Sequence, residues 1–208
     1  MNEKLNNLQK KINIKFKNLN YLKKSITHKS YDSLKNYEKL EFLGDRILGF
    51  VISKKLIELY PDEKEGILDK KLASLVNKNK CLEVGKFIGL EKYILLGNKS
   101  LNSKVENKII SDSIEALIGA IYYDCGLDTS EKFILKIWKK FIKQSEKTII
   151  DSKTRLQEYS LKKFKLLPTY KLISSSGPKH KPNFTVSVKL KNTKLYDGSG
   201  DSKKKAEQ

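Results

Sequence analysis

Two stretches of the sequence collect carboxylates at spacings that suit a metal site. In residues 110–124, ISDSIEALIGAIYYD, a helical step of about 100° per residue places Asp112 and Glu115 on one face. In residues 37–50, YEKLEFLGDRILGF, the same step brings three acids onto one face: Glu38, Glu41 and Asp45. If the two faces meet in the folded protein, the carboxylates repel one another and lose solvation, so a divalent cation is their natural compensation. Because the ligands would all be oxygen atoms, we expect Mg²⁺, for which Mn²⁺ can substitute, rather than zinc.

A solvated acidic stripe on an ordinary surface helix is the simpler interpretation of either stretch. Three residues of the first stretch argue against it. Phe42 lies among the acids, where an aromatic ring needs a partner surface. Gly44 and Gly49 each cost about 1 kcal/mol in a helix interior, and Gly49 falls on the acidic side, as Gly119 does in the second stretch. We therefore expect a close approach to the helix backbone at Gly49.

The two acidic stretches resemble those of a known family. YEKLEFLGDRIL is similar to the signature segment of the ribonuclease III endonucleases, and DSIEALIGAIYYD resembles the second acidic helix of their catalytic domain. The resemblance covers nearly the whole chain, because residues 151–208 resemble the double-stranded-RNA-binding domain that follows the nuclease domain in bacterial members. It implies an all-α nuclease domain followed by a small α+β domain.

The resemblance also implies roles for individual residues. The family's metal ligands map onto four acids: Glu41, Asp45, Asp112 and Glu115. Of these, we expect Asp45 and Glu115 to be catalytic. Glu38 and Glu65 match acids that support the catalytic valley, although a place at the start of a helix is itself an adequate reason for an acid at Glu65. Phe42 matches an aromatic side chain that enters a socket on a twin subunit, so we expect a homodimer.

Composition limits the partners of the chain. Its 208 residues suffice for one full domain and one small one, and 43 Lys and Arg against 24 Asp and Glu give a net charge of +19. A polyanion is the expected partner, although charge alone does not choose between nucleic acid, an anionic membrane surface and acidic proteins. Because no long apolar run or secretory leader is present, we expect a soluble, cytoplasmic protein with no membrane partner and no nucleotide or organic cofactor.

Other catalytic chemistries have little support in the sequence. His28, in ITHKSY, is one of two histidines, and a histidine near a helix end is more often a structural hydrogen-bonding residue than a general base. Cys81 and Cys125 lack the spacing of zinc ligands, so we expect two reduced, packed thiols. No Ser/His/Asp or Cys/His constellation is evident, which disfavours a covalent mechanism.

Helices must position these residues in the larger domain. Apolar periodicity predicts a helix near the N-terminus, another around residues 21–26 and a long one from the first acidic stretch to about Tyr60. A further helical stripe is predicted over residues 68–87, with breaks at Gly85 and Gly89. A last helix is expected from Thr129, with Thr129 or Ser130 as its N-cap.

The remainder of the chain is expected to form a separate RNA-binding domain. From residue 151 onward, 14 Lys and Arg against 5 Asp and Glu give it a charge of +9. The pattern predicts a helix over residues 153–164, three strands and a helix that opens at Ser202. Because the sequence stops barely one turn into that helix, we expect the domain to lack most of it and its sheet to expose an apolar face. The predicted parts are a catalytic domain over residues 1–147, a linker over 148–152 and an RNA-binding domain over 153–208.

Three local features of this domain suit double-stranded RNA. The helix containing TRLQEY offers amide and carboxylate groups to 2′-hydroxyls in the wide minor groove, from Thr154, Gln157 and Glu158. The Gly-Pro turn in SGPKHKPNF projects a side chain suited to the next minor groove, His180. The last helix begins with ammonium groups that suit phosphates across the major groove: Lys203, Lys204 and Lys205. Their order and spacing together favour an RNA-binding domain.

The resemblance implies that the chain hydrolyses phosphodiester bonds of duplex RNA with a divalent metal and leaves staggered ends. The ion would activate a water for in-line attack and stabilise the leaving oxygen, so the protein supplies no nucleophile. By resemblance, the substrates would include precursors of ribosomal and transfer RNA and structured messenger RNA. One alternative is a catalytically silent protein that binds double-stranded RNA, against which the intact acids argue. Another is a basic DNA- or ribosome-associated protein, which leaves the paired acidic helices unexplained.

Overall fold

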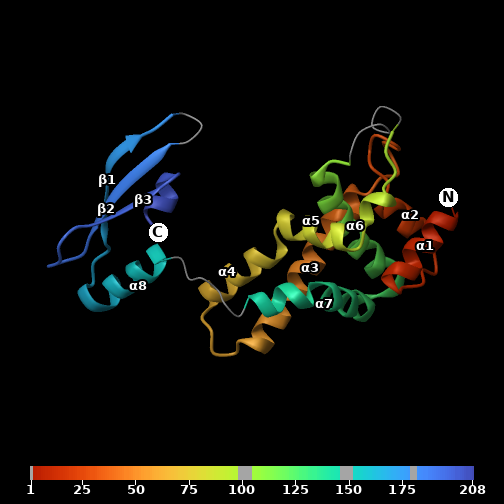
Figure 1. The fold of residues 1–208 in the computed structure, drawn as a ribbon. Coiled ribbons are helices and arrows are strands. Elements are labelled where there is room, and N and C mark those ends of the chain that lie inside the picture. Colours follow the sequence, from red (N-terminus) through yellow and green to blue (C-terminus); the bar gives the residue numbers. More distant parts are fainter. Residues whose placement is uncertain (1, 98–104, 146–151, 179–181) are drawn as a thin grey trace. The chain divides into compact units, whose positions relative to one another are not determined.

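The chain divides into two compact units, Met1–Lys147 and Thr148–Gln208 (Figure 1). The computed structural model describes residues 2–97, 105–145, 152–178 and 182–208. The described part of the first unit is helical, and that of the second is a three-stranded antiparallel sheet with a helix before it and a short helix after it. This confirms the predicted order of elements. None of the described helices combines the length and the apolar character needed to cross a membrane.

The first unit is built around one central helix, α6 (Figure 1). Every residue of α6 from Ile109 to Ile121 is buried, and the helix packs against α2, α3, α5 and α7. A helix that is buried on all sides is fixed in place by its neighbours, so the acids that it carries are fixed as well. The bounds of the elements are α1 Asn2–Ile12, α2 Leu19–Ser25, α3 Glu38–Leu59, α4 Glu65–Val76, α5 Lys78–Phe87, the 3₁₀ helix η1 Leu90–Lys92, α6 Asn107–Cys125 and α7 Leu127–Gln144.

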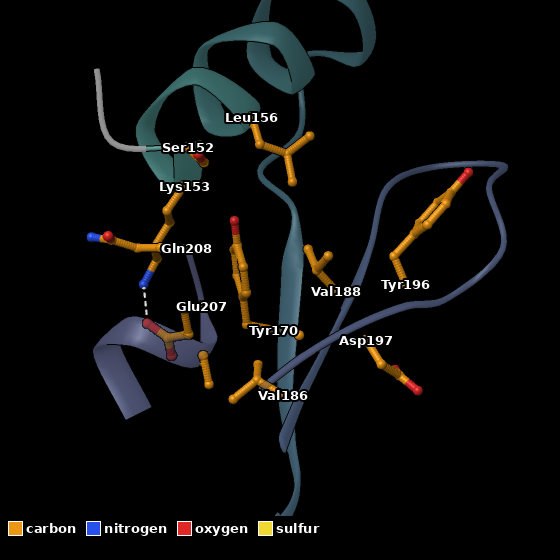
Figure 2. A pocket seen from close by; sticks show the side chains of 12 residues that line it. Ser152, Lys153, Leu156, Tyr170, Val186, Val188, Tyr196, Asp197, Glu207 and Gln208 are labelled. Atoms are coloured by element: carbon orange, nitrogen blue, oxygen red, sulfur yellow. Dashed lines mark hydrogen bonds and ion pairs between the residues drawn. The ribbon is translucent and has the colours of Figure 1, made fainter. Parts of the chain in front are cut away.

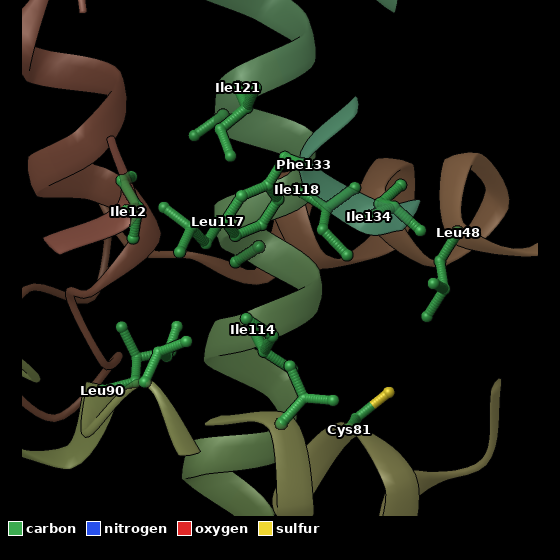
Figure 3. Close-up of a cluster of buried hydrophobic side chains, with 14 of the residues drawn as sticks. Ile12, Leu48, Cys81, Leu90, Ile114, Leu117, Ile118, Ile121, Phe133 and Ile134 are labelled. Atoms are coloured by element: carbon green, nitrogen blue, oxygen red, sulfur yellow. The ribbon is translucent and has the colours of Figure 1, made fainter. Parts of the chain in front are cut away.

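The hydrophobic core surrounds α6. Figure 3 shows four apolar side chains of α6 among residues of the neighbouring elements: Ile114, Leu117, Ile118 and Ile121. Leu48 of α3, Cys81 of α5 and Leu90 of η1 belong to the same cluster and, like these four, are fully buried. Each fully buried Leu or Ile side chain contributes roughly 1.5–3 kcal/mol relative to an exposed one. The core therefore joins the helices that carry the candidate site.

Two glycines let α3 and α6 touch backbone to backbone. A Cβ atom at Gly44 would lie 1.8 Å from the carbonyl oxygen of Glu115, and one at Gly119 would lie 2.2 Å from the carbonyl oxygen of Leu40. Any side chain at either position would push the helices apart. The close approach that the sequence suggested at Gly49 is instead made at Gly44 and Gly119. At Gly49, in contrast, no heavy atom of the described chain lies within 4 Å of such a Cβ.

The helical stripe predicted over residues 68–87 is in fact two helices, α4 and α5, that meet at Asn77. The backbone of Asn77 is extended, and its side chain bonds both helices: the oxygen accepts from the backbone of α5, and the amide donates to two carbonyls of α4. The break predicted at Gly85 is wrong. Gly85 lies inside α5. A glycine is needed there because a Cβ atom would lie 2.7 Å from the side chain of Ile110 on α6.

Helix α7 begins at Leu127, two residues before the predicted start at Thr129. The preceding Gly126 has a φ of 83°, a conformation that favours glycine, and it makes the turn from α6 into α7. Ser130 is buried inside the helix, where its hydroxyl donates to the carbonyl of Gly126. The predicted side-chain N-cap is therefore wrong, because the glycine makes the turn that the cap was expected to define.

The second unit consists of α8 Ser152–Phe164, β1 Thr169–Ser176, β2 Asn183–Lys189, β3 Tyr196–Gly200 and α9 Lys203–Ala206. The antiparallel strands follow the order β1-β2-β3, and α9 packs against β2 and β3. Gly198 permits this contact, since a Cβ there would lie 2.6 Å from the carbonyl oxygen of Ala206. A hollow of about 310 Å³ lies between α8, the sheet and α9, with Leu156, Val186 and Val188 in its wall (Figure 2). The hollow is lined largely by apolar side chains, although Val186 itself is only 2% exposed.

Candidate functional site

Carboxylates from α3 and α6 converge in one pocket. One oxygen atom from each of Glu41, Asp112 and Glu115 lies within 4.8 Å of the other two. The glycine contact between the two helices favours this convergence, because it lets the backbone of α3 approach that of α6 closely at the level of Glu115. The adjoining pocket has a volume of about 440 Å³ and is lined by Glu38, Glu41, Phe42, Asp45, Arg46, Lys78 and Glu115.

Two lysines pair with the buried carboxylates. The side chains of Asp112 and Glu115 are only 1% and 2% exposed, so their charges need partners. The ammonium of Lys78, the first residue of α5, lies 2.8 Å from Asp112 Oδ1, 2.7 Å from Glu115 Oε2 and 3.2 Å from Glu41 Oε1. Lys108, one turn before Asp112 on α6, donates to the other carboxylate oxygen, Oδ2, at 2.6 Å. Three carboxylates thus share two ammonium groups.

The pKa values of the three carboxylates shift in different directions. Burial raises the pKa of Glu115, and the hydrogen bond from Lys78 offsets that only in part. Burial and the charge of Asp112 raise the pKa of Glu41. Burial also acts on Asp112, but hydrogen bonds from Lys108 and Lys78 hold its pKa below the usual value. Only the carboxylate with two ammonium partners is therefore stabilised in its charged form, and the other two would gain from a further cation.

The fourth predicted ligand, Asp45, lines the same pocket but faces a different partner. Its Oδ2 atom accepts a hydrogen bond from Arg46 at 2.8 Å, and the guanidinium of Arg46 also lies 4.1 Å from the centre of the Phe42 ring. Glu38 is at the rim, where it forms an exposed ion pair with Lys29 at 3.4 Å. The structure thus places the acids of α3 around one pocket, with Glu41 nearest to the acids of α6.

Glu65, the other predicted supporting acid, lies elsewhere in the chain. It is the first residue of α4 and lines a separate pocket of about 170 Å³ between α3 and α4. The remaining walls of that pocket are mainly apolar and include Leu56, Ile57, Leu68 and Leu72. Within one chain, Glu65 and Glu38 therefore do not line the same pocket.

The histidine and the cysteines make no second catalytic centre among the described residues. The Nδ1 atom of His28 lies 2.8 Å from the hydroxyl of Ser30 and serves the local turn. Cys81 and Cys125 are free thiols, as predicted. Cys81 is buried beside the cluster, with its sulfur 3.6 Å from Glu115 Oε1, and burial raises the pKa of its thiol. A raised pKa keeps that thiol protonated and poorly reactive.

The sequence interpretation missed the two lysines of the cluster. The position of Lys108 carried a signal, because a residue four before Asp112 on a helix lies beside it. The position of Lys78 carried no such signal, because it is 34 residues from Asp112 in the sequence. Only the packing of α5 on α6 brings the two side chains together.

The RNA-binding candidates of the second unit lie on its surface. On α8, Glu158 is exposed and Thr154 and Gln157 are half-buried. Three exposed lysines begin α9, whose first turn is capped by the hydroxyl of Ser202: Lys203, Lys204 and Lys205. The ammonium of Lys205 lies 2.5 Å from Asp201. The predicted contact residue His180 lies outside the described residues.

Two family profiles match the chain, and each falls within one of the two units of the fold. The family described as Ribonuclease-III-like matches residues 18–141, and the double-stranded RNA binding motif matches residues 152–208. The chain is 62% identical over 202 residues to Ribonuclease 3 of Pelagibacter ubique, covering 97% of this chain and 91% of that protein. It is 40% identical over 213 residues to Ribonuclease 3 of Leptospira interrogans, covering 98% of this chain and 86% of that protein.

A solved structure shows the same helical fold. The nuclease domain of ribonuclease III from Campylobacter jejuni matches with a TM-score of 0.61 and 34% identity, covering 64% of this chain and 93% of that one. A second structure of this domain, whose description concerns flexibility in a region involved in dimer formation, matches with a TM-score of 0.62 and 33% identity, over 64% of this chain and 94% of that one. On sequence and fold together, this chain belongs to the ribonuclease III family.

Proposed function

We propose that this chain is a metal-dependent endoribonuclease that hydrolyses phosphodiester bonds in double-stranded RNA and leaves staggered ends. Membership of the family supports an endoribonuclease that acts on double-stranded RNA. The observation that carries the metal dependence is the convergence of Glu41, Asp112 and Glu115 within 4.8 Å of one another. Such a cluster is costly for the fold, since it brings like charges together away from water, and a catalytic role accounts for that cost.

The residues present fit a divalent metal ion. Four carboxylates would hold it: Glu41, Asp45, Asp112 and Glu115, of which Asp45 and Glu115 are the proposed catalytic pair. The donors are all oxygen atoms, which suits Mg²⁺ or Mn²⁺. The pKa values of Glu41 and Glu115 are raised mainly by burial, and the charge of a bound cation would favour their ionised forms. When bound, such an ion supplies Lewis-acid activation of water and stabilisation of the leaving oxygen.

The protein itself would position the RNA strand over these carboxylates. The pocket of about 440 Å³ opens beside the cluster, so a phosphate group and a water molecule can both enter it. Glu115 forms its fixed side, because the core holds α6 in place. Asp45 and Glu38 on α3 form its more exposed side. The chain supplies no covalent nucleophile in this scheme.

The second unit would bind the duplex and recognise its shape. We assign the contacts in one minor groove to Thr154, Gln157 and Glu158 on α8. The contact in the next minor groove is assigned to His180. Phosphate contacts are assigned to the start of α9, where Lys203 and Lys204 are exposed. Lys205 would contribute less, because it already pairs with Asp201.

A homodimer would give the enzyme one catalytic centre for each RNA strand. The support is an apolar row on the exposed side of α3, where Phe42, Phe50 and Ile57 are 63%, 56% and 59% exposed. Gly49 lies within this row, and a second chain could approach its open backbone closely. The apolar pocket between α3 and α4 is a candidate socket for Phe42 of a twin subunit. Because Glu65 lines that pocket, such docking would bring Glu65 beside the twin's acidic cluster.

Precursors of ribosomal and transfer RNA and structured messenger RNA are the substrates that we propose, in the cytoplasm. The decisive experiment incubates the protein with duplex RNA, single-stranded RNA and duplex DNA, each with and without Mg²⁺. Cleavage of duplex RNA only, and only with Mg²⁺, is the expected result. Retention of duplex RNA without cleavage would indicate a silent binding protein, and equal binding of duplex DNA would indicate a general basic nucleic-acid-binding protein.

A further inference from the structure

We propose that Lys78 is a built-in counter-cation of the carboxylate cluster, and that a divalent metal ion must displace its ammonium group in order to bind. This inference rests on the metal site proposed above. Lys78 hydrogen-bonds to all three of the converging carboxylates, Glu41, Asp112 and Glu115, at 2.7–3.2 Å. These three are the acids whose oxygens converge closely enough to hold one ion. The ammonium therefore stands where the cation would stand.

The two positively charged groups exclude each other for geometric reasons. Mg²⁺ takes its oxygen ligands at about 2.0–2.1 Å, so an ion held by these three acids would have to lie among their converging oxygen atoms. The ammonium of Lys78 occupies that position with contacts to Asp112 Oδ1 and Glu115 Oε2 of 2.8 and 2.7 Å. A metal ion on the same oxygens would lie against the ammonium, and two cations at contact distance repel strongly. Binding of the metal is thus coupled to departure of the ammonium.

Lys108 differs from Lys78 in this respect. It contacts Oδ2 of Asp112, whereas Lys78 contacts Oδ1. Lys108 can therefore keep its hydrogen bond while a cation binds the other oxygen of the same carboxylate. Its side chain is also more exposed, 77% against 55% for Lys78, so solvent screens its charge more effectively. Removal of Lys108 should affect metal affinity less than removal of Lys78.

The fold allows Lys78 to leave without a change in the backbone. Lys78 is the first residue of α5, and its side chain is about half exposed, so rotation about its side-chain bonds can carry the ammonium into solvent. Asp112 and Glu115 are nearly fully buried and stay in place. The lysine thus keeps the carboxylates together while no metal is bound and gives way when one arrives.

Mn²⁺ affinity of the RNA-free protein tests this inference. In Lys78→Met, measured by electron paramagnetic resonance of free Mn²⁺, we expect binding roughly tenfold tighter than in wild type, because one unit charge is removed from hydrogen-bond distance of the site. Lys108→Met should show a smaller gain. The matched control is Lys80→Met on the same helix. The side chain of Lys80 pairs with Glu83 and lies over the ring of Phe141, away from the cluster. The Mn²⁺ affinity of this variant should equal that of wild type.

The outcomes separate this inference from the proposed function. If wild type binds Mn²⁺ and Lys78→Met binds it with equal or lower affinity, the proposed role of Lys78 is wrong. The proposed metal site would still be supported. No Mn²⁺ binding by either protein overturns both proposals.

A second measurement uses the wild-type protein and does not depend on folding of a variant. Lysine side chains are acylated briefly with and without Mn²⁺, and the modified peptides are quantified by mass spectrometry. Lys78 should react several-fold faster with Mn²⁺, because its ammonium has been released from the carboxylates, while Lys80 reacts at the same rate in both conditions. A rate for Lys78 that Mn²⁺ leaves unchanged or lowers would overturn the inference.

Discussion

Asp112 and Glu115 are ionisable side chains that the fold has almost removed from water. A buried carboxylate without a partner costs several kcal/mol, and a neutral residue of similar size would avoid that cost. The protein instead surrounds them with Glu41 and two lysines. The arrangement leaves Glu41 and Glu115 with pKa values above their usual range. We assign these residues to a metal site because oxygen atoms of Glu41, Asp112 and Glu115 lie within 4.8 Å of one another.

Replacement of Glu115 by Gln should abolish cleavage and spare RNA binding. The amide keeps the shape of the side chain but removes the charge that would hold the metal. We expect a loss of at least about 100-fold in the cleavage rate, since even the outer partners of a metal ligand are worth 10–100-fold. Asp45→Asn should behave in the same way. Cleavage rates and duplex RNA affinity, measured by gel assays on the same preparations, check this.

The matched control is Glu83→Gln, an acid on α5 that pairs with Lys80 away from the cluster. It should cleave at the wild-type rate. A Glu115→Gln variant with full activity would remove Glu115 from the assigned ligands.

At the level of elements, the site depends on the contact between α3 and α6. Both helices present glycine at the crossing, so the nearby carboxylates Glu41, Asp112 and Glu115 come within reach of a single ion. Neither helix alone holds a complete set of acids. The geometry of the contact therefore determines the geometry of the site.

Gly44→Ala should destabilise the nuclease unit by about 3 kcal/mol or more. Its methyl group would lie 1.8 Å from a backbone carbonyl that α6 cannot move away, which is a more severe overlap than ordinary overpacking. Gly66→Ala is the control, because no heavy atom of the described chain lies within 4 Å of a Cβ at that exposed helical position. The control should gain about 0.5–1 kcal/mol. Urea unfolding measures both values, and a Gly44→Ala variant as stable as wild type would contradict the close contact.

Helical periodicity predicts much of this arrangement because it is a local property of the chain. It indicates correctly that Glu41 shares a face with Asp45 and that Asp112 shares one with Glu115. It does not predict the break at Asn77 or the turn at Gly126, which depend on one capping side chain and one positive φ angle. It also misses Lys78, because no local pattern shows which residue of α5 will face α6. Contacts between residues far apart in the sequence need the structure.

At the scale of the whole molecule, the net charge favours the binding of double-stranded RNA. The net charge of +19 on 208 residues creates a field that attracts any polyanion, and the second unit carries +9 of it. Affinity that depends on phosphate contacts falls steeply with salt concentration. The salt dependence of binding therefore reports how many phosphates each unit contacts.

Replacement of Lys203 and Lys204 by Gln should weaken duplex RNA binding. It should also lower the magnitude of the slope of log affinity against log salt concentration by about 2, because the variant neutralises two fewer phosphates. Both side chains are exposed at the start of α9. Fluorescence anisotropy over a range of salt concentrations measures the slope. Lys139→Gln with Lys140→Gln, an exposed pair on α7, serves as the control. Equal slopes for the two double variants would argue against a special role for α9.

Phe42→Asp should convert the protein to a monomer. A carboxylate in place of the exposed ring would meet Asp45 and Glu38 on the same surface and could not fill an apolar socket. Sedimentation velocity should give the mass of one chain, 23.9 kDa, for the variant and twice that value for wild type. Phe87→Asp replaces another exposed phenylalanine of the same unit, on α5, and should remain dimeric. A dimeric Phe42→Asp protein would place the interface elsewhere.

The position of a bound metal ion tests the central claim most directly. Crystals of the protein grown or soaked with Mn²⁺ can be measured at the manganese absorption edge, where anomalous scattering locates the ion without assumptions about its ligands. We predict an anomalous peak between Glu41, Asp112 and Glu115, with the ammonium of Lys78 moved away from them. A strong peak at another site, with these three carboxylates still bound to Lys78, would contradict the account.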